Sequence, residues 1–335
     1  MPDDHLGASM PDDLNETVIE FPDNRLLIDL CGQFDRNLAQ LEQGFGVAIT
    51  RRGNILTILG GPEAREQAAG ALTALYERLE DGRAVEPADI DTLIRMGALP
   101  EETAASEHQL DMFPGGRLEI RTRKKVIEPR SQTQARYVGE LFEKSMVFGI
   151  GPAGTGKTYL AVAAAVAMFL DGRVDRIILS RPAVEAGERL GFLPGTEKDK
   201  MDPYMRPLYD ALGDMLPGKQ VAKLMEEGKI EIAPLAFMRG RTLSNAYVVL
   251  DEAQNTTEMQ MKMFLTRMGE GAHMAVTGDP SQIDLPRGTR SGMVQAVRLL
   301  EGIADIGFVR FSAADVVRHP LVAKIVKAYD RETPE

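Results

Sequence analysis

The sequence predicts an α/β fold, in which a parallel β-sheet is covered by helices on both faces and is preceded by a small α+β domain. Two observations support the large domain. From about residue 131, apolar strand-like runs alternate with amphipathic helices, and the glycine-rich segment GPAGTGKT lies between one such strand and the next helix. A third observation supports the small domain, because residues 17–82 contain closely spaced strands, a hairpin turn and helices.

The small domain is built from elements that the local pattern identifies one by one. The turn at residues 51–54 contains the glycine and asparagine that hairpins prefer, and Pro62 suits the first turn of a helix. We expect strands and helices at residues 18–21, 37–43, 46–50, 55–59, 62 onward and 87–96. The expected domains are a disordered tail at 1–16, the small domain at 17–99, a linker and basic hairpin at 100–130, and the large domain at 131–330.

Composition argues against several classes of protein. The chain of 335 residues carries 39 Lys and Arg against 50 Asp and Glu, and its net charge of −11 argues against a protein that coats nucleic acid through general basicity. The single cysteine, Cys31, excludes an intramolecular disulfide. The acidic, polar amino terminus does not resemble a signal peptide, and the longest apolar stretch, 159–170, is shorter than the roughly 20 residues that span a bilayer. We expect a cytoplasmic protein without a membrane segment.

The segment at residues 151–158 has the pattern of a P-loop, because the apolar run MVFGI enters it and a helix at 157–170 leaves it. Its glycines let the backbone wrap round phosphates, while the helix N-terminus adds positive potential. Lys157 is expected to contact the β- and γ-phosphates of ATP, and the Thr158 hydroxyl is expected to bind Mg²⁺. The expected ATP-binding residues are Gly151, Pro152, Ala153, Gly154, Thr155, Gly156, Lys157 and Thr158.

A pair of carboxylates follows a second buried strand, in which the run YVVL at residues 247–250 ends in Asp251 and Glu252. A carboxylate at the end of a strand beside the P-loop strand is placed to hold Mg²⁺, and the next carboxylate can polarise the attacking water. We therefore assign Asp251 to the metal and Glu252 to catalysis. Without a P-loop, the same pair would be interpreted as a solvated strand end.

A third strand, at residues 274–277, ends in the segment GDPSQIDLP at 278–286. Its polar residues project from the carboxyl end of a strand, where open parallel sheets bind their ligands. Gln282 is therefore expected to sense the γ-phosphate or to orient water. The alternative is a helix-capping turn built by Asp279 and Pro280.

Four further segments accompany these motifs: VEAGERLGFLPG, DPYMRPLYDAL, FMRGRTLSNAYVVLDEAQN and DVVRHPLV. With them the chain resembles the bacterial PhoH-like ATPases that carry a KH-like N-terminal domain, over nearly its whole length from about residue 17. The resemblance implies a RecA-like P-loop core related to superfamily 1 helicases. It also implies hydrolysis of ATP, work in RNA metabolism and a functional link to a YbeY-type endoribonuclease.

The resemblance also implies roles for residues outside the P-loop. Gln134, in RSQTQARY, precedes the P-loop strand where related ATPases read adenine with a glutamine, and Gln132 is the nearby alternative. Arg318, which follows the predicted strand at 307–311, resembles the arginine that touches the γ-phosphate, and the alternative is an arginine on a helix surface. The predicted catalytic residues are Lys157, Glu252, Gln282 and Arg318.

The small domain departs from the RNA-binding pattern of KH domains at one loop. Where those domains have G-x-x-G, this chain has GQFD at residues 32–35, which lacks the second glycine and adds a negative charge. This departure argues against RNA binding through the loop and fits a module that docks protein partners or subunits. The segment 117–130, with six basic and two acidic side chains, is either a second candidate RNA contact or a solvated hairpin.

Two functions are compatible with the sequence. The first is an ATPase that remodels or moves along single-stranded RNA; the second is an ATP-dependent switch or scaffold that assembles with a ribonuclease or a ribosomal particle. Because the chain after Gly151 has room for one core domain of roughly 200 residues, we expect a neighbouring subunit to cover the site, in a homo-oligomeric ring that is a hexamer. Arg318, acting in cis or from the neighbouring subunit, would complete the site, with Arg239, Arg241 and Arg290 as alternatives.

Overall fold

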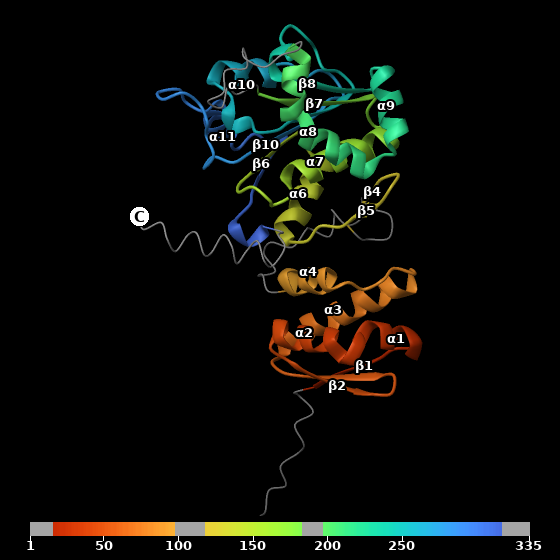
Figure 1. Ribbon diagram of the computed structural model, residues 1–335. Helices are drawn as coiled ribbons and strands as arrows, with labels where there is room; N and C mark the ends of the chain where they lie inside the picture. Colours follow the sequence, from red (N-terminus) through yellow and green to blue (C-terminus); the bar gives the residue numbers. More distant parts are fainter. Residues whose placement is uncertain (1–15, 98–117, 183–196, 317–335) are drawn as a thin grey trace, which may run out of the picture. The chain divides into compact units, whose positions relative to one another are not determined.

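The computed structural model describes residues 16–97, 118–182 and 197–316. The chain divides into two compact units, Met1–Glu102 and Thr103–Glu335, which Figure 1 shows coloured along the sequence. The division falls inside the predicted linker. Five sequence predictions lie wholly or mainly outside the described residues: the tail at 1–16, the first part of the linker, the segments VEAGERLGFLPG and DVVRHPLV, and Arg318.

The N-terminal unit packs helices against an antiparallel sheet of three strands, in the order β1-β3-β2. Its elements are β1 (Glu16–Glu20), α1 (Asn24–Cys31), α2 (Arg36–Phe45), β2 (Ala48–Arg52), β3 (Ile55–Leu59), α3 (Pro62–Glu80) and α4 (Pro87–Gly97). Each predicted strand and helix of this unit has a counterpart among these elements. The sequence reasoning missed α1, whose eight residues are too short to show a clear helical period; Asp23 caps it by accepting a hydrogen bond from the Arg25 amide at 2.8 Å.

The loop that replaces a G-x-x-G sequence has an unusual backbone. Gly32, Phe34 and Asp35 all have positive φ, and the two non-glycine residues stand at 55°. The Phe34 side chain is fully exposed at this loop. The KH-like character of the unit stays a prediction.

The second unit contains a six-stranded parallel sheet in the order β11-β6-β10-β9-β7-β8. Its strands are β6 (Met146–Ile150), β7 (Arg176–Arg181), β8 (Ile230–Pro234), β9 (Ala246–Leu250), β10 (His273–Gly278) and β11 (Ile306–Arg310). The helices are α6 (Gln132–Glu143), α7 (Lys157–Leu170), α8 (Glu197–Met215), α9 (Gly218–Glu226), α10 (Glu258–Leu265) and α11 (Gly292–Leu300). The predicted α/β fold with a parallel sheet is confirmed.

Two hydrophobic cores lie on the two faces of this sheet, because successive side chains of a strand point to opposite sides. In β6, Val147 joins the core beneath α6, α7, α8 and α9, whereas Phe148 joins the core beneath α10 and α11 (Figure 1). The central helix α7 is buried along ten of its 14 residues, several of them alanines, so it can pack closely against both the sheet and its neighbouring helices. Among the described residues, none of the helices is long and apolar enough to cross a bilayer.

The basic segment forms a short hairpin of β4 (Ile120–Arg121) and β5 (Val126–Ile127). Lys124 Nζ donates to the Gly213 carbonyl at 2.5 Å, and Lys125 Nζ lies 2.6 Å from the Asp214 carboxylate, both in the last turn of α8. The Lys125 ammonium also stands 5.3 Å from the centre of the Tyr159 ring. The two lysines thus bind the hairpin to the protein itself, which weakens the case for an RNA contact here.

Candidate functional site

Four neighbouring strands bring polar residues to one edge of the parallel sheet. The strands β6, β10, β9 and β7 follow one another in the sheet and run in the same direction. At their carboxyl ends they carry, in that order, the P-loop, Asp279, the Asp251–Glu252 pair and Arg181. This is the edge at which open α/β sheets bind ligands.

The P-loop backbone has a conformation that glycine adopts without strain. Gly151, Gly154 and Gly156 have φ of 141°, 83° and 84°. A Cβ atom on Gly151 would clash with the backbone oxygen of Phe311, and one on Gly156 would come within 3.2 Å of the Gln134 side chain. No described side chain caps the N-terminus of α7, so its first amide groups suit an anion.

Lys157 begins α7 and its side chain lies over the loop. Its Nζ donates to the carbonyls of Gly151 and Pro152, both at 2.6 Å, and contacts the Thr155 hydroxyl at 3.3 Å. Burial lowers the pKa of Lys157, and this effect is opposed by the nearby carboxylates of Asp279, Asp251 and Glu252. The positive charge is thus held between carbonyl oxygens and a set of carboxylates at the place where the phosphates of a nucleotide would lie.

Thr158 and Asp251, which stand 93 residues apart in the chain, are in direct contact. The sequence prediction that the strand of Asp251 lies beside the P-loop strand is wrong, because β10 lies between β6 and β9. The Thr158 hydroxyl donates to Asp251 Oδ1 at 2.6 Å, and Thr277 Oγ1 donates to the same oxygen at 2.9 Å. Hydroxyl and carboxylate oxygens are the hard ligands that Mg²⁺ prefers, and a P-loop site supplies the remaining ligands from phosphate and water. Among the described residues, no group of three or more His, Cys, Asp or Glu side chains forms a metal site by itself.

Glu252 directly follows Asp251 and has a left-handed backbone conformation, with φ of 52°. A non-glycine residue in this region carries strain of about 1–3 kcal/mol, which persists only where the surroundings fix the residue. Its Oε1 accepts from Arg181 Nη2 at 2.7 Å, and its Oε2 accepts from Gln254 Nε2 at 2.5 Å. The side chain is 39% exposed, so its carboxylate is both held in place and accessible from solvent.

Arg181, Gln254 and Thr277 are residues of this site that the sequence analysis missed. Arg181 ends β7 and contacts both carboxylates, since its Nε also lies 3.4 Å from Asp251 Oδ2. The Gln254 side chain joins β9 to β10, because it donates to the Gln282 carbonyl at 3.2 Å and accepts from the Asp279 amide at 3.0 Å. In the sequence, the only available signal was the position of each residue just after, or at the end of, a buried strand.

The segment after β10 begins with a turn at Asp279. Asp279 forms a local turn, because its Oδ1 accepts from the Ser281 amide at 2.9 Å and from the Ser281 hydroxyl at 2.7 Å. Its Oδ2 is buried and has no hydrogen-bond partner among the described residues, so it could accept from a ligand or a water at the site. Gln282 is exposed beside it. Its role as a γ-phosphate sensor stays a prediction.

Gln134 is buried beneath the P-loop. Its Nε2 donates to the Thr155 carbonyl at 2.9 Å, and its Oε1 accepts from the Arg130 amide at 2.6 Å. Both polar ends of the side chain are therefore used to hold the loop in place. An adenine contact through Gln134, which stays a prediction, would require one of these hydrogen bonds to be exchanged.

A buried hydrogen-bond chain continues from Gln134 to the region that precedes Arg318. The Gln134 amide donates to Ser131 Oγ at 3.2 Å, and this hydroxyl donates to Asp315 Oδ1 at 2.8 Å. Arg318 itself lies outside the described residues. Of the alternative arginines, Arg239 and Arg290 are exposed, whereas Arg241 forms a two-pronged ion pair with Glu231 at 2.6 and 2.7 Å. The Arg241 guanidinium is thus already paired with a carboxylate of the same chain.

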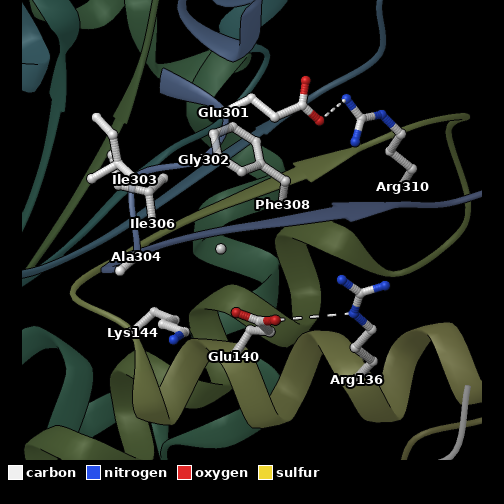
Figure 2. A pocket seen from close by; sticks show the side chains of 11 residues that line it. Arg136, Glu140, Lys144, Glu301, Gly302, Ile303, Ala304, Ile306, Phe308 and Arg310 are labelled. Atoms are coloured by element: carbon white, nitrogen blue, oxygen red, sulfur yellow. Dashed lines mark hydrogen bonds and ion pairs between the residues drawn. The ribbon is translucent and has the colours of Figure 1, made fainter. Parts of the chain in front are cut away.

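A separate hollow of about 400 Å³ lies at the outer strand β11 and contains no residue of the P-loop or of the carboxylate pair (Figure 2). Arg136 and Glu140 line it from α6, Lys144 lines it just after this helix, and Arg310 pairs with Glu301 at 3.0 Å in its lining (Figure 2). Glu140 Oε2 is buried without a hydrogen-bond partner among the described residues and faces Gly307. The charges of opposite sign largely pair with each other, so this hollow has no evident catalytic arrangement.

The chain is similar to PhoH-like proteins over most of its length. The family model "PhoH-like protein" matches residues 126–330. The PhoH-like protein of Mycobacterium tuberculosis is 48% identical over 98% of this chain and 91% of its own length, and that of Bacillus subtilis is 48% identical over 93% and 95%. Protein PhoH of Escherichia coli is 42% identical over 73% of this chain and 66% of its own length.

A solved structure of the Pyrococcus furiosus Hef helicase domain is 15% identical, with a TM-score of 0.32, over 60% of this chain and 44% of its own. This similarity is too low to carry an argument about activity. The family match, in contrast, covers more than half of the chain, and the relatives match nearly all of it. On these matches, the chain belongs to the PhoH-like protein family.

Proposed function

We propose that this protein is a Mg²⁺-dependent ATPase whose site is formed by the P-loop, Thr158, Asp251 and Glu252. The observation that carries the proposal is the contact between Thr158 and Asp251 at 2.6 Å, directly beside a P-loop of the required backbone conformation. A hydroxyl from the P-loop helix and a carboxylate from the end of a strand in the same sheet, here β9, are the two protein ligands that Mg²⁺ has in P-loop ATPases. Family membership supports the same class of activity.

Each residue has a distinct task in this proposal. The amides at the start of α7 bind the phosphates, and Lys157 exchanges its hydrogen bonds to Gly151 and Pro152 for phosphate oxygens. Thr158 and Asp251 would hold Mg²⁺, which neutralises charge on the phosphates. Glu252 accepts a proton from, or orients, the attacking water, since its carboxylate lies next to Asp251 and is accessible to solvent.

We further propose that ATP hydrolysis is coupled to the remodelling or processing of RNA. Support comes from the segment after β8, at the same edge of the sheet as the nucleotide site. There Phe237 is 60% exposed and Arg239 is exposed two residues later. An exposed aromatic ring beside a cation suits a base stacked next to its phosphate. The alternative, a switch or scaffold that assembles with a YbeY-type ribonuclease or a ribosomal particle, is favoured by the internal pairing of Lys124 and Lys125.

RNA stimulation of ATP turnover separates these two functions. We expect single-stranded RNA to raise kcat several-fold and Phe237→Ala to remove most of this increase while leaving the rate without RNA unchanged. The matched control is Leu299→Ala, which removes another exposed apolar side chain, 64% exposed, from α11. Steady-state ATP hydrolysis with and without an unstructured RNA measures both effects. Equal rates with and without RNA in the unaltered protein would contradict the coupling of hydrolysis to RNA and would favour the switch or scaffold.

Assembly into a homo-oligomeric ring is part of the proposal, with a hexamer as the expected form. A mixture of Lys157→Ala and Arg318→Ala proteins tests it, because each variant alone lacks one half of a shared site. Random assembly of equal amounts should restore about one quarter of the sites, each with one intact P-loop and one intact arginine from the neighbour. Native mass spectrometry gives the subunit number. A fully active monomer at nanomolar concentration would contradict the ring.

A further inference from the structure

Arg181 joins three structural elements through one side chain. Its Nη2 donates to Glu252 Oε1 at 2.7 Å, and its Nε lies 3.4 Å from Asp251 Oδ2, so the guanidinium spans the two carboxylates at the end of β9. Its Nη1 donates to the Tyr204 carbonyl of α8 at 2.7 Å. The side chain is 18% exposed and leaves the end of β7, the strand that lies beside β9. One planar group therefore hydrogen-bonds Glu252 to the main chain of α8 and forms an ion pair with Asp251, without a hydrogen bond from its Nε to any described residue.

The contact with α8 distinguishes this arrangement from an ordinary surface ion pair. A surface pair joins two mobile side chains and has little influence on either. Here the third partner is the main chain of α8, whose last turn is itself held by Lys124 and Lys125 of the hairpin. A displacement of α8 at Tyr204 would move the guanidinium, and with it the carboxylate of Glu252. The left-handed backbone at Glu252 gives a further reason why its orientation depends on such partners.

We infer that Arg181 is a positioning residue, which sets the orientation of the Asp251–Glu252 pair and couples it to the position of α8. The inference rests on the proposed ATPase function and adds to it a link between the carboxylate pair and α8. Arginine suits this task because its fork donates in several directions within one plane, whereas lysine presents a single ammonium. The coupling is reciprocal, so nucleotide bound at the site should in turn alter α8.

The test compares Arg181→Ala, Arg181→Lys and the control Arg176→Ala, which removes an arginine from the other end of the same strand. We expect Arg181→Ala to bind a fluorescent ATP analogue with a Kd within about twofold of the unaltered protein, since the P-loop is intact. Its kcat should fall on the order of 100-fold, as expected for a misplaced functional group. Arg181→Lys restores the charge without the three contacts and should recover only a small part of kcat. Arg176→Ala should keep both values.

Hydrogen–deuterium exchange supplies a readout that does not depend on turnover. We expect the amides of α8 from Tyr204 onward to exchange faster in nucleotide-free Arg181→Ala than in Arg176→Ala. A non-hydrolysable ATP analogue should change α8 exchange in the unaltered protein and not in Arg181→Ala. If the unaltered protein hydrolysed no ATP, the proposed function would fail. These exchange differences would still support the coupling of Arg181 to α8. An unchanged or raised kcat in Arg181→Ala, full recovery by lysine, or unaltered α8 exchange would overturn the inference.

Discussion

Lys157→Ala should abolish nucleotide binding and hydrolysis while leaving the fold intact. In the proposed site the ammonium would face the β- and γ-phosphates, and the P-loop contains no other cation that could replace it. In the free protein it is a buried charge whose pKa is lowered by burial, so its removal should cost little stability. Thermal unfolding with and without Mg²⁺ and ATP measures the stability of the fold and the binding of nucleotide, and steady-state ATP hydrolysis measures turnover. At a nucleotide concentration of about 100 Kd, the unaltered protein should gain about 2.7 kcal/mol, and the variant should gain nothing.

The control for this variant is Lys144→Ala, which removes a partly exposed lysine after α6 that pairs only loosely, at 3.9 Å, with Glu143. It should keep the full stabilisation by ATP. Undiminished turnover in Lys157→Ala would mean that the P-loop is not the hydrolysis site. Loss of folding without nucleotide would instead assign Lys157 a structural task, through its hydrogen bonds to Gly151 and Pro152.

Glu252→Gln should separate binding from chemistry. The amide keeps the shape of the side chain, and its oxygen can still accept from Arg181, so the Kd for ATP should stay within about threefold. The variant loses the group that accepts a proton from water, and kcat should fall by about 10²- to 10⁴-fold. Equilibrium binding of a fluorescent ATP analogue and single-turnover hydrolysis measure the two quantities independently.

Glu270→Gln is the matched control, because this exposed glutamate lies before β10 at the opposite edge of the sheet. It should behave as the unaltered protein in both measurements. A parallel loss of ATP binding and turnover in Glu252→Gln would identify Glu252 as a binding residue. Retained turnover would mean that another residue acts as the base. Asp279, whose buried Oδ2 has no hydrogen-bond partner among the described residues, would be the first residue to examine.

The parts of the site that the sequence predicts are those with local signals. The P-loop with its strand and helix is found from a single segment, and α7 begins and ends where the sequence places it. The juxtaposition of Thr158 and Asp251 follows from the rule that parallel strands end at one edge. Arg181 was not predictable in this way, since its partners depend on β7 and β9 being neighbours, which long-range strand pairing decides. A local pattern contains no such information.

A similar limit applies to the basic hairpin and to Gln134. The sequence gives the charge of Lys124 and Lys125, but whether they face solvent or α8 is decided by tertiary contacts. Gln134 was predicted near the nucleotide, and the structure places its side chain against the P-loop carbonyl of Thr155. Its hydrogen-bonding groups are used by the backbone, which a sequence motif does not reveal.

The left-handed backbone at Glu252 has a consequence for the evolution of the protein. Glycine or asparagine would adopt this backbone conformation at lower free energy, but glycine would also leave Arg181 and Gln254 without the carboxylate that they contact. In the proposed ATPase, a glutamate at this position would reflect a trade-off between stability and activity, as expected where function requires a side chain that the local backbone disfavours. Selection for heat resistance alone, in a laboratory lineage freed from the need for turnover, should replace Glu252 before most other residues of the sheet edge.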